Sequence, residues 1–499
     1  MIIKNKIKYL LLGSVALLLS FGSCKKWDDH TAATAPSLNV TLLEQVKANP
    51  ELSKFYEYLV KTGYDTVLAS SKNLTVWAPD NAALQGLDAN VVNDVEQLKL
   101  LIGNHIAALS YFTTEPNPEV SVRTLSKKNV IFKADAYGEA SITSSDVFLK
   151  NGVLHTVDMA IRPKLNIWEY LNASDAALQK AQLNSLNYTE RDLEKSEIIG
   201  YDQATGQPIY KEGIGLVTRN SFLNRHDISN EDSVYTYIVL TDEAYNAEKA
   251  KLGPYFNTPE PETTDSLANL NVISTLAIKG RFDANNLPAT LYSEDDSVVY
   301  NLDKNAIVST YNASNGVVLV MNKLDYDMVS KLKPVIIEGE LSYTLQSSKT
   351  VQRRQRRNST DIESPLYRSF FEDLLIENHG VSSFWVKYTR TLKSAKYKVY
   401  FRAVRDFNLV PPAGSTDITQ FRQRIAFGSN TATDIPYYEN VGVIDQGNGV
   451  YTPNYEEVYA GEYTVQEYGP TDVFLVANNV STNGLNTLLL DYIKLVPVP

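Results

Sequence analysis

The spacing of hydrophobic residues divides the chain into two regions of different texture. In the first region, up to about residue 335, some apolar residues recur at helical spacing and others alternate along short strands. Leu42 to Tyr58 predicts an amphipathic helix, and Val95 to Leu109 predicts another. Strands that alternate with helices in this way indicate a mixed α and β architecture.

The remaining third, past Pro334, carries short apolar or alternating segments separated by turn clusters such as Pro411-Pro-Ala-Gly414. These segments predict strands at Ser383–Thr389, Lys396–Arg402, Thr419–Phe427, Gly461–Val465, Asp472–Val476 and Asn486–Leu495. Many short strands with no helix of note indicate an antiparallel β-sandwich. A length of 499 residues agrees with about three domains in total.

The amino terminus has the three parts of an export signal. A basic start is followed by an apolar run from Tyr9 to Phe21 and then by Gly22-Ser23-Cys24. The run is shorter than the roughly 20 residues that span a bilayer, so a retained transmembrane anchor is not expected. Phe21 to Cys24 resembles the processing site of a bacterial lipoprotein. The resemblance implies a signal peptide over 1–23 and lipidation of Cys24, whereas the alternative is an ordinary secretory signal with a chance cysteine.

The residues after Cys24 indicate where the protein is delivered. Lys25-Lys-Trp-Asp-Asp29 resembles the charged tag that directs some Gram-negative lipoproteins to the outer face of the outer membrane. Small residues and a proline follow from Thr31 to Ser37, and they predict a tether over 24–37. Several acyl chains on one cysteine give stable anchoring. We therefore expect an outer-membrane protein exposed at the cell surface, with the periplasmic face as the alternative.

Three segments in order resemble the motifs of the fasciclin domain. They are Asn73-Leu-Thr-Val-Trp-Ala-Pro-Asp-Asn-Ala-Ala-Leu84, Leu101-Ile-Gly-Asn-His-Ile106 and Asn151-Gly-Val-Leu-His-Thr-Val-Asp158. The resemblance implies an α+β fasciclin-like domain over residues 38–164. Within it, Asp80 or Asn81 is expected to accept hydrogen bonds at a strand-to-helix turn, and the Asn-Gly pair predicts a tight hairpin.

The same motifs recur in weaker form further along the chain. The matching segments are Tyr235–Tyr245, Val272–Leu276 and Asn315–Asn322. Residues 165–335 therefore resemble a second, divergent fasciclin-like domain in tandem with the first. An insertion is expected from about residue 187 to 230, with a turn-rich hairpin at Asp202–Gly206.

The repeat also predicts the role of two histidines. His105 and His155 of the first copy correspond to Leu276 and Leu319 in the second. A leucine cannot transfer protons or bind a metal, but it packs as well as a buried imidazole does. We therefore expect both histidines to lie in the core, and the other possibility is that the first copy alone is active.

Residues 336–499 resemble the galactose-binding-like jelly roll of carbohydrate-binding modules, an all-β sandwich. The resemblance implies that sugar rings stack on aromatic side chains in the loops. The candidate glycan-binding residues are Tyr437, Tyr438, Tyr451, Tyr455 and Tyr459. Tyrosine is abundant throughout, with 31 in the chain, so the alternative is that these residues contact no ligand. The family also implies a structural calcium at Asp491; no other cofactor is expected.

Composition narrows the function. The net charge of −11 argues against a nucleic-acid partner, and the lone Cys24 excludes an intramolecular disulfide framework. The basic run Arg353–Arg357 is expected to be a solvated loop, with an anionic glycan or an acidic partner as the alternative. Phosphate-loop, serine-hydrolase and zinc-protease motifs do not occur in the sequence, so we expect no enzyme.

The sequence therefore predicts a glycan-binding or adhesion accessory at the cell surface, held by its lipid anchor and associated with a SusCD-type glycan uptake system. Its expected partners are the membrane and either a polysaccharide or an extracellular protein. A protein–protein adhesion scaffold that binds no sugar is the alternative. A glycan-active hydrolase is the third possibility, because carboxylate pairs leave no sequence spacing.

Overall fold

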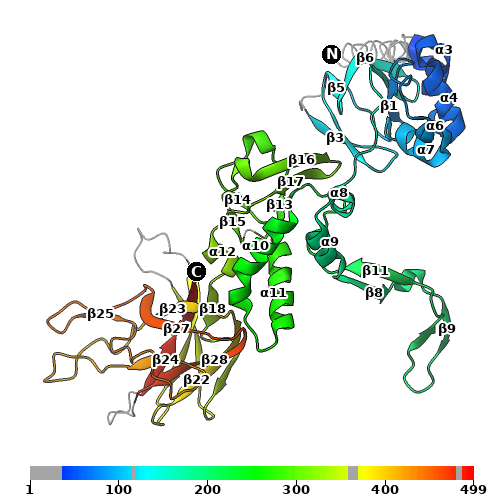
Figure 1. Ribbon diagram of the computed structural model, residues 1–499. Coiled ribbons are helices and arrows are strands. Elements are labelled where there is room, and N and C mark those ends of the chain that lie inside the picture. Colours follow the sequence, from blue (N-terminus) through cyan, green and yellow to red (C-terminus); the bar gives the residue numbers. More distant parts are fainter. Residues whose placement is uncertain (1–35, 115–118, 296, 358–368, 479–485) are drawn as a thin grey trace, which may run out of the picture. The chain divides into compact units, whose positions relative to one another are not determined.

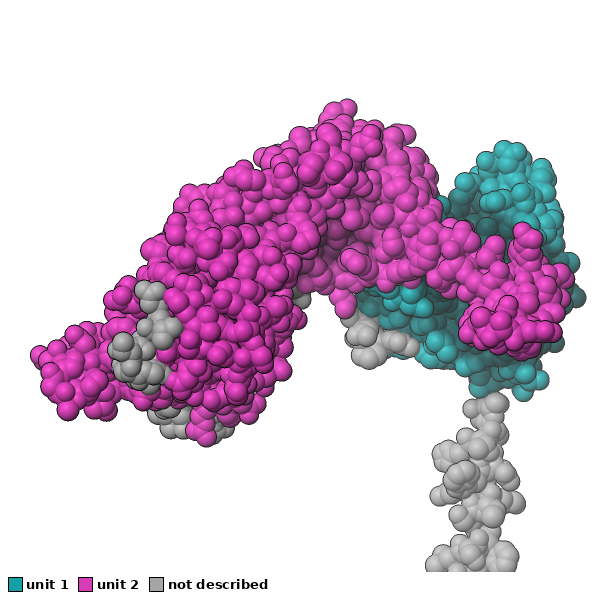
Figure 2. Space-filling view, turned by 90° about the horizontal axis from the view of Figure 1, so that it is seen from below, with its two compact units in different colours: residues 1–170, 228–234, 312–316 teal, residues 171–227, 235–311, 317–499 magenta. Residues whose placement is uncertain are grey.

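The computed structural model describes residues 36–114, 119–295, 297–357, 369–478 and 486–499. These residues form two compact units (Figure 2). The first unit holds residues up to 170 together with the short segments 228–234 and 312–316. The second holds residues 171–227, 235–311 and 317–499. The lipidation predicted at Cys24 lies outside the described residues. Within them, none of the helices has the length and hydropathy needed to cross a bilayer.

The first domain is a seven-stranded sheet with helices, in the strand order β2-β1-β7-β6-β5-β4-β3 (Figure 1). The central strands β1 and β7 are parallel, and Thr75 lies opposite Val153. The helices are α3 (Leu42–Ala48), α4 (Ser53–Thr62), α5 (Tyr64–Leu68), α6 (Ala89–Asn93) and α7 (Val95–Gly103). The strands are β1 (Leu74–Pro79), β2 (Ile106–Ala107), β3 (Val120–Arg123), β4 (Asn129–Phe132), β5 (Ala136–Tyr137), β6 (Ala140–Leu149) and β7 (Gly152–Val157).

Both predicted helices of this domain are shorter than expected. The helix predicted over 42–58 is divided into α3 and α4, because Pro50 cannot continue a helix and instead starts the short 3-10 turn η2 (Pro50–Leu52). The helix predicted from Val95 ends at Gly103, since the chain then pairs with β1 as strand β2. Asp80 accepts from the Ala83 amide at 2.7 Å, as predicted, although turns follow it rather than a helix.

The second domain repeats the central sheet in the order β13-β12-β17-β16. Its helices are α8 (Ile167–Ala173), α9 (Ala177–Asn184), α10 (Asp242–Leu252), α11 (Pro261–Ile273) and α12 (Met328–Leu332). Its strands are β12 (Tyr235–Leu240), β13 (Ala277–Lys279), β14 (Leu291–Tyr292), β15 (Val299–Tyr300), β16 (Ile307–Ala313) and β17 (Gly316–Met321). The order β13-β12-β17-β16 corresponds to β2-β1-β7-β6 of the first domain.

Equivalent side chains make equivalent hydrogen bonds in the two domains, which confirms the repeat. Thr75 donates to the Leu109 carbonyl at 2.7 Å, and its counterpart Thr236 donates to the Gly280 carbonyl at 2.9 Å. The Trp77 amide donates to the His105 carbonyl at 2.9 Å, just as the Ile238 amide does to Leu276 at 3.1 Å in the second copy. These pairs follow the alignment of the motifs residue by residue.

The asparagine of each Asn-Gly pair fastens the first helix of its domain. Asn151 accepts from the Leu42 amide at 2.8 Å and donates to the carbonyls of Leu68 at 2.7 Å and Ser70 at 2.6 Å. The second copy has the same three bonds. Asn315 accepts from the Ile167 amide at 2.9 Å and donates to the Ile228 and Asn230 carbonyls at 2.8 and 3.0 Å. Both asparagines are buried, so these bonds close the domain around its carboxyl-terminal hairpin.

The predicted insertion is a β-hairpin arm. Strands β8 (Asn187–Arg191) and β11 (Leu216–Asn220) form its base, and β9 (Ile198–Tyr201) and β10 (Pro208–Tyr210) form its outer part. In Figure 1 this ribbon runs from β8 and β11 out to β9. Asp202 accepts from the Ala204 and Thr205 amides in the turn at the tip, as the turn-rich segment predicts.

The last third is an all-β sandwich. Its two principal sheets have the orders β18-β30-β23-β27 and β19-β22-β28-β24, with a third sheet β20-β21-β29 and a small hairpin β25-β26. The strands are β18 (Val335–Glu338), β19 (Tyr343–Leu345), β20 (Gln352–Arg357), β21 (Phe370–Glu377), β22 (Trp385–Leu392), β23 (Lys396–Arg402), β24 (Gln423–Phe427), β25 (Val443–Asp445), β26 (Tyr451–Pro453), β27 (Val458–Thr464), β28 (Gly469–Ala477), β29 (Thr487–Leu490) and β30 (Tyr492–Val498). One hydrophobic core, including Val399, Leu475 and Leu495, joins the sheets.

The basic run Arg353–Arg357 is part of strand β20 and not the solvated loop that the sequence predicted. Strand β21 supplies acidic partners in register. Arg354 forms two bonds to the buried Asp373 at 2.8 and 2.6 Å, and Arg353 pairs with Glu372 at 2.7 Å. Because these pairs neutralise much of the run, it offers less charge to an anionic ligand than the sequence suggests.

Candidate functional site

The candidate site is a small cavity at the edge of the sandwich, where the segment 435–438 lies beside β24. Main-chain bonds between Tyr438 and Gln423 hold the segment there, at 2.8 and 3.3 Å. The cavity measures about 40 Å³. Its lining consists of Phe401, Gln423, Arg424, Ile425, Ile435, Pro436, Tyr437, Tyr438, Ala460 and Leu475. It therefore draws on both principal sheets and on the segment 435–438.

Tyr437 and Tyr438 take different places at the cavity. Tyr438 packs edge-on against Phe401 of the core, with ring centroids 5.2 Å apart. Burial raises the pKa of its phenol, so the ring stays neutral at physiological pH. The Tyr437 hydroxyl donates to the Ala477 carbonyl at 3.2 Å. Both side chains remain half-buried, and part of each ring is accessible to a ligand.

Arg424 is the polar residue of the site that sequence reasoning missed. Its guanidinium lies 4.7 Å from the centroid of the Tyr437 ring, and its Nη2 donates to the Asn430 carbonyl at 3.3 Å. The buried Nε–H finds no acceptor among the residues that the structure describes. A buried donor without a partner costs about 1–3 kcal/mol.

The other three predicted tyrosines do not line this cavity. Tyr451 is buried in a separate small cluster with Ile418 and Val443, and its hydroxyl donates to Asp417 at 3.2 Å. Tyr455 is half-buried, and its main-chain carbonyl accepts from Arg402 at 2.7 Å. Tyr459 lies on β27 with 51% of its surface exposed and packs against Tyr400 at 5.5 Å. The structure thus brings two of the five predicted residues together.

Asp491 is engaged by an arginine. It is buried and accepts from Arg402 Nη1 at 2.7 Å. Burial raises the pKa of the Asp491 carboxyl, and the Arg402 guanidinium opposes that shift. Calcium requires six to eight oxygen ligands. No group of three or more His, Cys, Asp and Glu side chains suited to a metal occurs within the described ranges. The donor set around Asp491 therefore does not fit the calcium that the family resemblance implies.

The two histidines of the first domain are core residues, as the repeat predicts. His105 is fully buried; its Nδ1 lies 2.9 Å from the Trp77 carbonyl oxygen, and its Nε2 accepts from the Ile161 amide at 2.9 Å. Burial lowers its pKa to about 4. His155 is likewise buried, with a lowered pKa, and stacks on Trp77 at 5.7 Å. Both rings are therefore neutral at physiological pH and bonded to the main chain.

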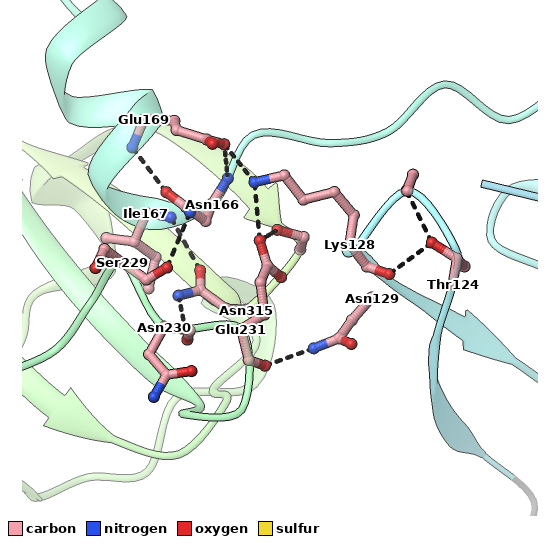
Figure 3. A network of polar contacts seen from close by, with 12 residues as sticks. Thr124, Lys128, Asn129, Asn166, Ile167, Glu169, Ser229, Asn230, Glu231 and Asn315 are labelled. Carbon is pink, nitrogen blue, oxygen red and sulfur yellow. Dashed lines mark hydrogen bonds and ion pairs between the residues drawn. The ribbon is translucent and has the colours of Figure 1, made fainter. Parts of the chain in front are cut away.

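A second polar cluster lies in the first unit (Figure 3). Lys128 pairs with Glu169 at 2.5 Å and with the buried Glu231 at 2.8 Å, and Ser314 donates to Glu231 at 2.8 Å. Asn129 donates to the Glu231 carbonyl at 2.6 Å. One lysine shared by two carboxylates fastens distant segments of the chain together, and we assign the cluster a structural role.

The hairpin arm carries an unusual number of exposed apolar side chains. They are Tyr188, Leu193, Ile198, Ile199, Tyr201, Ile209, Ile214 and Leu216. Leu193 is 67% exposed and Tyr201 is 65% exposed. A two-stranded hairpin is marginally stable in water, and these side chains leave apolar surface accessible on this one element.

Comparison with known proteins identifies the first α+β domain. Residues 50–163 match the family model of the fasciclin domain. The second α+β domain lies outside this match. It is a divergent copy of the first domain, because the two share their strand order and their equivalent hydrogen bonds. No curated protein matches the chain.

Three solved structures resemble parts of the chain. The FAS1 domain pair of the insect cell adhesion molecule fasciclin I shares 14% identity over 56% of this chain and 98% of its own, with a TM-score of 0.22. A family 6 carbohydrate-binding module shares 15% identity over 33% of this chain and 94% of its own, with a TM-score of 0.19. The CBM36-1 domain of a xylanase from the hindgut metagenome of Trinervitermes trinervoides shares 15% identity over 34% and 99%, with a TM-score of 0.19. Scores this low carry no weight for ligand or partner.

Proposed function

We propose that this chain is a lipid-anchored protein of the outer membrane, exposed at the cell surface, that binds a polysaccharide without transforming it. The anchor and the address rest on Cys24 and on the charged tag that follows it. The chain would act as an accessory to a SusCD-type uptake system, and its tether over residues 24–37 would hold the folded domains away from the membrane. The observation that carries glycan binding is the cavity at Tyr437 and Tyr438, with Arg424 beside it.

The chemistry of this site suits a sugar. The apolar CH face of a pyranose packs on an aromatic ring, and a fixed polar group orients its oxygens. Tyr437 and Tyr438 supply partly accessible rings, and the half-buried Arg424 places its guanidinium beside the Tyr437 ring. A hydroxyl bond to β28 holds the Tyr437 side chain, and packing against Phe401 holds the Tyr438 ring, so little side-chain entropy is lost on binding.

Affinity electrophoresis of the chain beginning at Lys25, against a panel of neutral and acidic polysaccharides, tests the proposal. We expect retardation by at least one polysaccharide, lost in Tyr437→Ala and retained in the matched control Tyr459→Ala. The absence of retardation across the panel would contradict glycan binding. Release of reducing ends from the retarding polysaccharide would contradict the non-enzymatic assignment.

A second function, docking to a protein of the outer membrane, is favoured by the hairpin arm. The turn at the tip of the arm, Asp202–Gly206, is polar, whereas apolar residues such as Ile199 and Ile209 lie along its length. This arrangement suits lateral contact with an apolar strip on a protein. Cross-linking on intact cells should capture one outer-membrane partner with the native chain but not with a chain in which 188–219 is replaced by a Gly-Gly turn. Equal capture by both chains would contradict this function.

A further inference from the structure

The last crossover of the sandwich turns at Asp491, between strand β29 of the third sheet and strand β30 of a principal sheet. Both main-chain groups of Asp491 are bonded to other parts of the sandwich. Its amide donates to the carbonyl of Arg402 in β23 at 2.9 Å, and its carbonyl accepts from the Gly339 amide, directly after β18, at 2.6 Å. The position of Asp491 therefore fixes where the chain passes from one sheet to the other.

The Asp491 side chain is bound by the same arginine. Arg402 Nη1 donates to its carboxylate at 2.7 Å, and both side chains are buried. Arg402 Nε donates to the Tyr455 carbonyl at 2.7 Å, and the guanidinium carbon lies 4.5 Å from the centroid of the Phe371 ring. A carboxylate, a carbonyl oxygen and an aromatic face each attract a cation. Arg402 Nη2 has no acceptor among the described residues, so the guanidinium is held by its charge more than by a full set of hydrogen bonds.

A second buried carboxylate comes from the neighbouring strand. Asp373 of β21 precedes the residue that pairs with Leu490, and Leu490 precedes Asp491. Two buried carboxylates at such neighbouring positions repel each other unless cations lie beside them. Arg354 and Arg356 lie 2.6 and 3.4 Å from the Asp373 carboxylate. Each of the two buried aspartates is therefore paired with arginine.

We propose that Arg402 takes the place of the calcium ion that the family resemblance implies at Asp491, so that the sandwich keeps its fold without a divalent cation. Arg356 also pairs with Asp406 at 2.6 Å, so three arginines face three aspartates here, and the charges of these six side chains balance. A calcium ion would add two positive charges to this balanced group. It would also need about six to eight oxygen ligands, whereas the guanidinium already occupies the Asp491 carboxylate.

The replacement changes what the stability of the sandwich depends on. A bound calcium ion stabilises a fold by mass action, to a degree that depends on its concentration. A guanidinium is part of the chain and stays charged at physiological pH, so neither a chelator nor a fall in calcium concentration removes it. We therefore expect the stability of β23 and β30, the strands on either side of the pair, to be independent of calcium.

Native-state hydrogen exchange of the chain beginning at Lys25, in calcium chloride and in EDTA, tests this independence. Exchange from β23 and β30 should be the same in both solutions. Slower exchange of these strands in calcium chloride, lost in Asp491→Asn, would show that the carboxylate binds calcium and would overturn the inference. The comparison requires no change at Arg402, so it remains decisive if a variant at that position does not fold.

Substitutions test the pairing itself. Arg402→Met leaves Asp491 buried without its cation and should accelerate exchange from β23 and β30 about a hundredfold or more. Adding Asp491→Asn should recover about tenfold of that loss, because neither charge then remains buried. The matched control, Lys494→Met with Glu457→Gln, removes a partly exposed ion pair at the same sheet and should change exchange by less than about fivefold. A double variant that exchanges as fast as the product of the two single effects would overturn the inference.

Discussion

The paired asparagines yield a prediction about how each α+β domain holds its own first helix in place. Asn151→Ala removes three buried hydrogen bonds, to Leu42, Leu68 and Ser70. At about 1 kcal/mol for each bond, the free energy of unfolding should fall by about 3 kcal/mol. The amide and carbonyl groups left unpaired in the interior favour a loss of at least this size. A typical domain is stable by only about 5–15 kcal/mol, so this loss is large.

Native-state hydrogen exchange with peptide resolution measures the loss where it occurs. Exchange from strands β1 and β7 should accelerate by roughly a hundredfold in Asn151→Ala, since each 1.4 kcal/mol is a factor of ten. Asn315→Ala should act by the same amount on β12 and β17, because it removes the equivalent bonds. The control Asn90→Ala changes an exposed helix residue and should alter stability by less than about 0.5 kcal/mol. An effect of Asn151→Ala no larger than that of this control would contradict a structural role for the three bonds.

Two further predictions concern buried groups elsewhere. Lys331 is buried, donates to the Asn271 carbonyl and to Thr275 at 2.6 Å, and burial lowers its pKa to about 7. Below pH 7 the amine is charged in both the folded and the unfolded state, so the full cost of burying that charge lowers the stability. Between pH 7 and 10 the folded state binds fewer protons than the unfolded state. The free energy of unfolding should therefore rise by up to about 1.4 kcal/mol per pH unit in that range. Urea unfolding at pH 7 and pH 9 should show this rise in the native chain and not in Lys331→Met, and the same rise in the variant would exclude Lys331 as its source. Gly152→Ala should destabilise by several kcal/mol, because an added Cβ would lie 1.9 Å from the Leu74 carbonyl oxygen, whereas Gly86→Ala meets no atom within 4 Å and should be neutral or stabilising; equal melting temperatures of the two variants would contradict this.

The sequence predicted best where a local pattern determines a local structure. The Asn-Gly pair at 151 predicted the β6–β7 hairpin, and the exchange of His105 for Leu276 predicted a core role. The predicted helix from Leu42 failed at Pro50, a residue that the apolar spacing alone does not weigh. Local signals thus gave the elements and their order, with errors at the boundaries.

What the sequence could not predict depends on partners far along the chain. Arg354 is neutralised by Asp373, and no spacing rule pairs two such segments. Tyr437 and Tyr438 form a site only because Phe401 of β23 and Ala460 of β27 meet them across the sandwich. Arg424 gave no signal at all, since an arginine in a strand is ordinary until its Nε is found to be buried without an acceptor.

The most direct test of glycan binding is the dissociation constant of the chain beginning at Lys25 and of its Tyr437→Ala variant, measured on the polysaccharide that retards the native chain most. Circular dichroism establishes that both are folded. We expect the variant to bind at least about tenfold more weakly, because stacking and the position of Arg424 are lost together. Equal constants for two folded chains would place sugar binding elsewhere and contradict the site described.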